Sequence, residues 1–112
     1  MLEKQFRLNK KPEYQKVFSH GSCYVSRLVV VYIYKDKSME HSQIGFIASK
    51  KVGNAVKRNK AKRLMREVVR KEISSFGQPC QMICIARKAI TKAALEDVKK
   101  SLSYLWRKGG II

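Results

Sequence analysis

The sequence predicts a single α+β domain, a sandwich in which helices pack on a mixed four-stranded sheet. The chain has 112 residues, of which 45% are hydrophobic, and a chain of that length folds around one modest core. Segments rich in β-branched residues alternate with segments whose apolar residues recur at helical spacing. No internal repeat or low-complexity linker divides the chain. We therefore expect one domain over residues 1–112, with the element order α-β-β-β-α-β-α.

The first predicted elements are a lead-in, a short helix and a strand. Residues 1–8 are basic, and we expect them to be extended. The helix begins at Asn9 or Lys11, and Gly21 fits its C-cap. A short strand within residues 22–27 would bring the sheet to four strands.

Two further strands follow. Residues 28–35 are β-branched and aromatic and have the length of a strand. One face of this strand is wholly apolar and should meet helices, whereas the other carries Tyr32 and Tyr34 and should be partly open. After a polar connector, residues 43–49 form the next strand. We expect it to run antiparallel to the previous one and to lead directly into a basic segment.

The basic segment, residues 50–71, holds ten basic residues and one acid, Glu67. From Ala55 onward it reads as an amphipathic helix, with Asn54 as a candidate N-cap. One arc of this helix is apolar, and a strip nearly opposite to it is polar and basic. The apolar arc contains Ala61, Leu64, Met65, Val68 and Val69, and the basic strip contains Asn59, Arg63, Arg66 and Arg70, with Lys62 beside it.

The arrangement of these charges indicates a polyanionic partner. Lys57 and Arg58 fall in the first helical turn, where the helix dipole disfavours cations, and together with the free N–H groups they make an anion site. Spaced arginines suit phosphate because guanidinium binds it bidentately. The whole chain has a net charge of +17 and a pI near 10.2, which a nucleic-acid partner explains most simply. A merely solvated basic face is the plainer alternative.

The C-terminal third of the sequence predicts a strand and a helix. The basic helix ends near Ser75, residues 80–86 form a buried strand, and Thr91 can N-cap a final helix. Residues 107–112 should be a frayed tail. The final helix should pack on the sheet through Leu95, Val98, Leu102, Leu105 and Trp106.

The sequence lacks the residue patterns that several kinds of chemistry require. The two histidines and eight acids are scattered, without metal-ligand or two-metal spacing. Cys23, Cys80 and Cys84 form no CxxC pair and are interpreted as reduced packing residues. No apolar run approaches the ~20 residues that span a membrane, and no signal peptide is evident. We therefore expect a cytoplasmic protein without a membrane partner, whose reacting groups, if any, come from another molecule.

The central segment resembles a known family. The run KKVGNAVKRNKAKRLMRE is similar to the signature of the bacterial ribonuclease P protein component, in which a strand precedes Lys-x-Gly-x-Ala-Val and an Arg-Asn-Arg helix. The runs FRLNKKPEYQKVFSHG and IARKA resemble other parts of the family. Lys60 departs from the pattern by replacing the second arginine, which keeps the charge but loses bidentate pairing. The matching residues are Lys51, Gly53, Ala55, Val56, Arg58, Asn59, Lys62, Arg63, Arg66 and Glu67.

The resemblance implies a fold, an activity and partners. The family fold is like that of ribosomal proteins and contains an unusual left-handed crossover. The family binds the ribonuclease P RNA, one protein for each RNA subunit, and this RNA chiefly holds the Mg²⁺ and carries the active site. The holoenzyme is an endoribonuclease that removes the 5′ leader of precursor tRNA by hydrolysis. The protein alone is therefore expected to be inactive.

The resemblance also implies roles for individual residues. The arginine-rich helix lies against the RNA subunit, and a cleft between the first helix and the sheet takes the single-stranded leader. No catalytic or metal-binding residue is expected. The expected contacts with the RNA subunit are Lys51, Lys57, Arg58, Asn59, Lys60, Lys62, Arg63, Arg66 and Arg70, and the expected leader contacts are Tyr14, Phe18, Tyr32 and Lys50.

Other functions remain as alternatives. Charge alone fits a ribosomal or other structural RNA-binding protein, or a DNA-compacting protein, although the latter does not need tyrosines on a sheet face. A self-sufficient nuclease is disfavoured by the scattered carboxylates. On spacing alone, Tyr14 and Phe18 fit core packing better than base stacking.

Overall fold

A computed structural model describes residues 2–112, and its centre is a four-stranded sheet in the order β1-β2-β4-β3. Strands β1 and β2 pair antiparallel, as do β2 and β4, whereas β3 and β4 pair parallel. The predicted mixed four-stranded sheet is confirmed, including the short first strand. The strands are β1 Ser22–Val25, β2 Val29–Lys35, β3 Gln43–Ile47 and β4 Cys80–Ala86.

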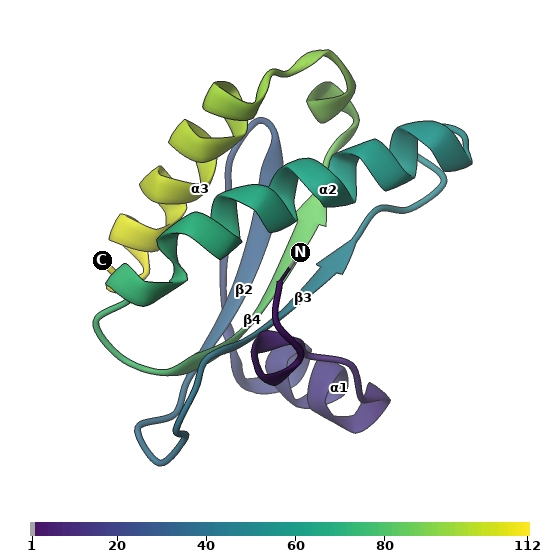
Figure 1. The fold of residues 1–112 in the computed structure, drawn as a ribbon. Helices are drawn as coiled ribbons and strands as arrows, with labels where there is room; N and C mark the ends of the chain where they lie inside the picture. The colour runs from purple at the N-terminus through teal and green to yellow at the C-terminus, as the bar shows by residue number, and fades with distance from the viewer. Residues whose placement is uncertain (1) are drawn as a thin grey trace.

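The parallel pair β3 and β4 is joined through helix α2, Ala55–Glu72. In Figure 1 the two strands point the same way, β4 lies to the left of β3, and α2 crosses in front of the sheet. This arrangement is a left-handed crossover, the rare hand. Strand β3 runs antiparallel to β2, as expected, but β4 lies between them. Nearly every β4 residue is buried, which suits a central strand covered on both faces.

One face of the sheet is covered by α2 and by α3, Leu95–Lys108, which lie on the same side (Figure 1). The apolar arc predicted for the basic helix meets this face: Ala61, Met65, Val68 and Val69 are buried, and Leu64 is half-buried. The final helix, α3, also buries an apolar side against this face. Its Trp106 indole N–H donates to the Met82 sulfur at 3.2 Å. Buried residues on α3 are Val98, Leu102, Leu105 and Trp106.

The other face carries α1, Lys11–His20, which starts at the second of the two predicted positions. Its Val17 is completely buried with Leu8 and Ile83 in a small second cluster. Because α1 is short, this cluster covers only part of the face, and the rest keeps half-buried side chains. The sheet thus has one fully covered face and one partly open face, as the tyrosines of residues 28–35 predicted.

Both ends of the chain are more ordered than predicted. Residues 1–8 are not simply extended, because Lys4–Phe6 form a 3₁₀ turn, and the Leu8 N–H donates to the Ile44 carbonyl at 3.0 Å. Met1 lies outside the described residues. At the other end the predicted fraying is wrong, because α3 continues to Lys108 and Ile111 is completely buried. An apolar side chain that fills the core holds each end in place.

Two N-cap residues were predicted, with different outcomes. Asn54 is the N-cap of α2, and its side chain accepts a hydrogen bond from the Lys57 N–H at 3.0 Å. Thr91 is not an N-cap, because it lies in the 3₁₀ turn Lys88–Lys92 and its hydroxyl donates back to the Lys88 carbonyl. Helix α3 starts later, and the Asp97 carboxylate accepts from the Ala94 N–H at 2.9 Å. A carboxylate three residues into the helix replaced the expected hydroxyl cap.

Candidate nucleic-acid interface

A strongly basic surface lies on α2 and the loop before it. The nine residues expected to contact RNA all lie on this segment, on the sides turned away from the core. The N-terminal part of α2 extends beyond the sheet (Figure 1), so its side chains are accessible from several directions. Lys51, Lys57, Asn59, Lys60, Arg63 and Arg70 are exposed, and Arg58, Lys62 and Arg66 are half-buried.

The start of α2 has the geometry of an anion site. Gly53 adopts a φ of +147°, a conformation that glycine adopts far more readily than other residues, and it places Asn54 at the cap. The first turn contains no acid but does contain Lys57 and Arg58. The dipole, the uncapped N–H groups and these two cations therefore act together on any phosphate at this point.

Arg70 differs from the other arginines of the helix. Its guanidinium forms two hydrogen bonds with the Glu67 carboxylate, at 2.7 and 3.2 Å, and Lys71 lies 3.5 Å from the same carboxylate. The hydrogen bond from Arg70 lowers the pKa of Glu67 and raises that of Arg70. At its C-terminal end this helix therefore pairs its acid, Glu67, with two basic residues. To contact a phosphate, the Arg70 guanidinium must give up at least one of its hydrogen bonds with the Glu67 carboxylate or use its remaining N–H groups.

Arg66 is oriented by an aromatic ring that sequence analysis did not assign to the site. Its guanidinium carbon lies 5.6 Å from the centroid of Phe46 in β3, within the range of cation–π attraction. Within the described residues, neither Arg66 nor Arg63 or Arg58 forms an ion pair. Their charges are thus available to an external anion, and Phe46 directs one of them.

A second surface lies where α1 meets the sheet. Phe18 is 40% exposed and packs edge-on against Tyr32, with ring centroids 4.9 Å apart and planes at 78°. Cys23 pairs directly across from Tyr32, and its thiol raises the tyrosine pKa by hydrogen bonding. Cys23 is exposed, so its interpretation as a packing residue is wrong. The structure brings together two of the predicted leader contacts and adds Cys23.

Tyr14 lies in the same region but is more constrained. Its hydroxyl donates to the Leu8 carbonyl at 3.0 Å and lies over Gly45, where any side chain would collide with it. Desolvation is the main cause of its raised pKa. Tyr14 therefore helps to hold the lead-in segment and β3 together, and only part of its ring remains accessible.

Lys50 lies apart from the aromatic pair. It is exposed and follows the C-terminal end of β3, whereas α1 lies near the opposite end of that strand (Figure 1). Between the two lies a row of half-buried apolar side chains, formed by Val30, Ile85 and Ile47 in register across three strands. Strand alternation places these three residues on the sheet face that carries α1. They remain half-buried because α1 is too short to cover them.

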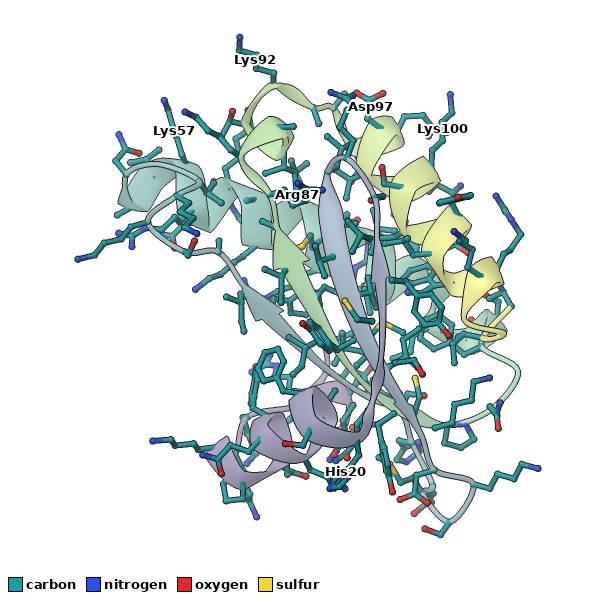
Figure 2. All side chains as sticks on the ribbon, turned by 180° about the vertical axis from the view of Figure 1, so that it is seen from behind. His20, Lys57, Arg87, Lys92, Asp97 and Lys100 are labelled. Carbon is teal, nitrogen blue, oxygen red and sulfur yellow. The ribbon has the colours of Figure 1, made fainter. Side chains whose placement is uncertain are left out.

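Figure 2 shows the molecule from behind, with His20 near the end of α1 and Arg87 toward the opposite end of the sheet. The Arg87 guanidinium donates to the Ser26 carbonyl at 3.0 Å, which fixes a cation at the end of β4. An open apolar row with lysine and arginine at one end and aromatic rings at the other suits a single strand of nucleic acid.

Metal-ligating side chains do not gather in the described part of the chain. Among residues 2–112, no group of three or more His, Cys, Asp or Glu side chains could hold a metal ion. Cys84 and Cys80 are buried, and desolvation raises the pKa of the Cys80 thiol to about 11. Within residues 2–112, no helix is long and apolar enough to cross a membrane.

The chain is similar to known proteins over nearly its whole length. The family model described as ribonuclease P matches residues 2–110. A ribonuclease P protein component of Bacillus pumilus is 39% identical over 110 residues, which cover 98% of this chain and 92% of the relative. One from Listeria monocytogenes is 36% identical over 111 residues, covering 99% and 93%.

Solved structures share the fold. The structure of a Staphylococcus aureus RNase P protein mutant with defective mRNA degradation activity matches with a TM-score of 0.89 at 32% identity, covering 98% of this chain and 92% of that one. The RNase P protein from Thermotoga maritima matches with a TM-score of 0.79 at 26% identity, covering 90% and 96%.

Proposed function

The chain belongs to the ribonuclease P protein family, and we propose that it binds the ribonuclease P RNA through α2 and the 5′ leader of precursor tRNA through the face beside α1. It is thereby the protein subunit of a ribonucleoprotein endoribonuclease that produces the mature 5′ end of tRNA. The observation that carries this proposal is the position of nine predicted RNA contacts on one helix and its entry loop, away from the core.

The role of α2 is to bind the folded RNA subunit. Arg58, Arg63 and Arg66 have no intramolecular acid partner among the described residues, and each can form bidentate contacts with phosphate. Lys60 supplies charge in place of the family's arginine, with less directional bonding. Phosphate contacts of this kind fix register and orientation and carry no sequence information directly.

The role of the second surface is to recognise the leader, the part that the product lacks. Phe18 and Tyr32 offer ring faces and edges to unpaired bases, and Lys50 lies near the far end of the open row. Stacking on aromatic rings tolerates any base, as a subunit that serves many precursors requires.

The chemistry itself belongs to the RNA subunit in this proposal. Among residues 2–112, no group of three or more His, Cys, Asp or Glu side chains could hold a metal ion, and we assign the Mg²⁺ chiefly to the RNA, as the family resemblance implies. The chain binds, orients and discriminates substrate, one protein for each RNA subunit, in the cytoplasm. Low-Mg²⁺ conditions should therefore reveal its contribution most clearly, because protein cations then replace part of the missing counter-charge.

The test is reconstitution. RNA-free protein added to ribonuclease P RNA at low Mg²⁺ should stimulate removal of the leader from precursor tRNA, and protein without the RNA should leave the precursor intact. Binding without stimulation would favour the alternative, a structural RNA-binding protein. Site-specific cleavage by protein shown to be free of RNA would contradict the assignment of the chemistry to the RNA subunit.

A further inference from the structure

A hollow with an apolar floor lies between α2 and the beginning of α3. It is lined by Leu64 and Leu95, with Lys60, Arg63 and Arg66 around them and Glu67 at one side. The two leucines come from different helices and are both half-buried. Further along α3, Val98 and Leu102 are completely buried, so the hollow begins where the packing between the two helices ends.

The charge around this hollow is positive. Glu67 is the acid in its lining, and its carboxylate is already paired with Arg70 and Lys71. Figure 2 shows that Lys57 and Lys92 project at the same end of the molecule, one from α2 and one from the 3₁₀ turn before α3. An apolar floor surrounded by cations complements a ligand with a flat apolar centre and flanking negative charge.

We propose that this hollow receives an unpaired base of the ribonuclease P RNA, seated against Leu64 and Leu95, with Lys60 and Arg63 on its flanking phosphates. The proposal rests on the proposed function of α2. A nucleotide has the required form, because its base is planar and its phosphates lie on either side. A base in an A-form helix cannot enter, so the contact must come from a bulge, loop or junction. An apolar segment of a partner protein would match the floor but not the surrounding cations.

Loss of the base contact and loss of a phosphate contact should affect the salt dependence of RNA binding differently. Each phosphate contact contributes to the slope of log K against log salt, whereas a contact with the uncharged base does not. Leu95→Gln should therefore lower affinity for ribonuclease P RNA about tenfold, the order expected for one lost base contact, with an unchanged salt slope. Leu64→Gln should do the same.

Arg63→Ala should instead reduce the slope by about one. Ile112→Gln is the matched apolar control, because Ile112 is 46% exposed and lies outside the leucine hollow, and it should leave both affinity and slope unchanged. Thermal melting of each variant establishes that it is folded.

Chemical probing of the RNA in the complex identifies the base. One unpaired base should lose reactivity when wild-type protein binds and regain it with Leu95→Gln. The proposal would be overturned if both leucine variants kept the wild-type affinity, or if either of them reduced the salt slope. It would also be overturned if every base of the RNA were equally reactive with wild-type and Leu95→Gln protein. Failure of the wild-type protein to bind this RNA would instead reject the proposed function itself.

Discussion

At the scale of single residues, the open face depends on a few side chains with unequal freedom. Tyr14 is held by a hydrogen bond and by Gly45, whereas Phe18 remains 40% exposed against Tyr32. Helical spacing assigned Tyr14 and Phe18 to the same face, but could not show that one is tied to the lead-in segment and the other faces solvent.

Phe18→Ala or Tyr32→Ala should weaken binding of precursor tRNA more than binding of mature tRNA. The lost stacking of ~1–3 kcal/mol per base affects only the RNA that has a leader. Paired affinity measurements with long-leader and leaderless RNA check this, and the loss should vanish when the leader is cut to one or two nucleotides. Tyr104→Ala, a 47% exposed tyrosine on α3, is the matched control. Equal losses for both RNAs would show that the rings serve folding instead.

Alkylation of native protein with a maleimide near neutral pH should modify Cys23 alone. Burial raises the pKa of Cys80 to about 11 and also raises that of Cys84, so neither forms much of the reactive thiolate. The adduct beside Tyr32 should reduce affinity for precursor tRNA and leave affinity for mature tRNA unchanged. Peptide mass mapping locates the label, and Cys23→Ala protein should be insensitive to the reagent. Labelling of a buried cysteine at a similar rate would contradict the packing described here.

At the scale of elements, α2 combines two functions on opposite sides. Its apolar arc fills the space over the sheet, and its other sides display cations. Because core packing fixes the helix axis, the spacing of the arginines along it becomes a fixed pattern of charges. Only Arg70 departs from the pattern, through its pairing with Glu67.

Replacing Arg63 and Arg66 together by alanine should weaken binding to the RNA subunit and reduce the salt slope by about one to two, since each lost phosphate contact contributes about 0.7 to 0.9. Titrations at several salt concentrations measure both quantities. Lys100→Ala combined with Arg107→Ala removes the same charge from exposed positions on α3, and should leave the slope nearly unchanged. If both double variants changed the slope equally, binding would depend on net charge and not on α2.

At the scale of the whole molecule, the C-terminus closes the core. The Ile111 N–H donates to the Trp106 carbonyl at 2.9 Å, and the Ile111 carbonyl accepts from the Gly77 N–H at 2.7 Å. These bonds tie the end of α3 to the segment between α2 and β4. The final residues therefore join two distant parts of the chain.

Ile111→Ala should lower the free energy of unfolding by about 2 to 5 kcal/mol, the usual cost of truncating a fully buried isoleucine. Its neighbour provides the control, because Ile112 is 46% exposed and Ile112→Ala should change stability by less than about 0.5 kcal/mol. Denaturant titration of both variants gives the comparison. Similar small effects would mean that the tail is frayed, as the sequence alone suggested.

Local patterns in the sequence were sufficient for most elements and for one of the two surfaces. Strand alternation and helical periodicity depend only on how often a backbone turns its side chains to the same side. Strands β2 and β4, the buried arc of α2 and the cap at Asn54 could therefore be predicted. The cations of α2 could be named for the same reason, since a helix displays its exposed residues in a known geometry.

Contacts between segments far apart in the chain needed the tertiary structure. The position of β4 between β2 and β3, the seating of Ile111, the pairing of Phe46 with Arg66 and the hollow at Leu64 and Leu95 all belong to this class. Each depends on which elements share a face and where their packing ends. These arrangements are determined by the free energy of packing the whole core, and the local sequence around a residue contains little information about them.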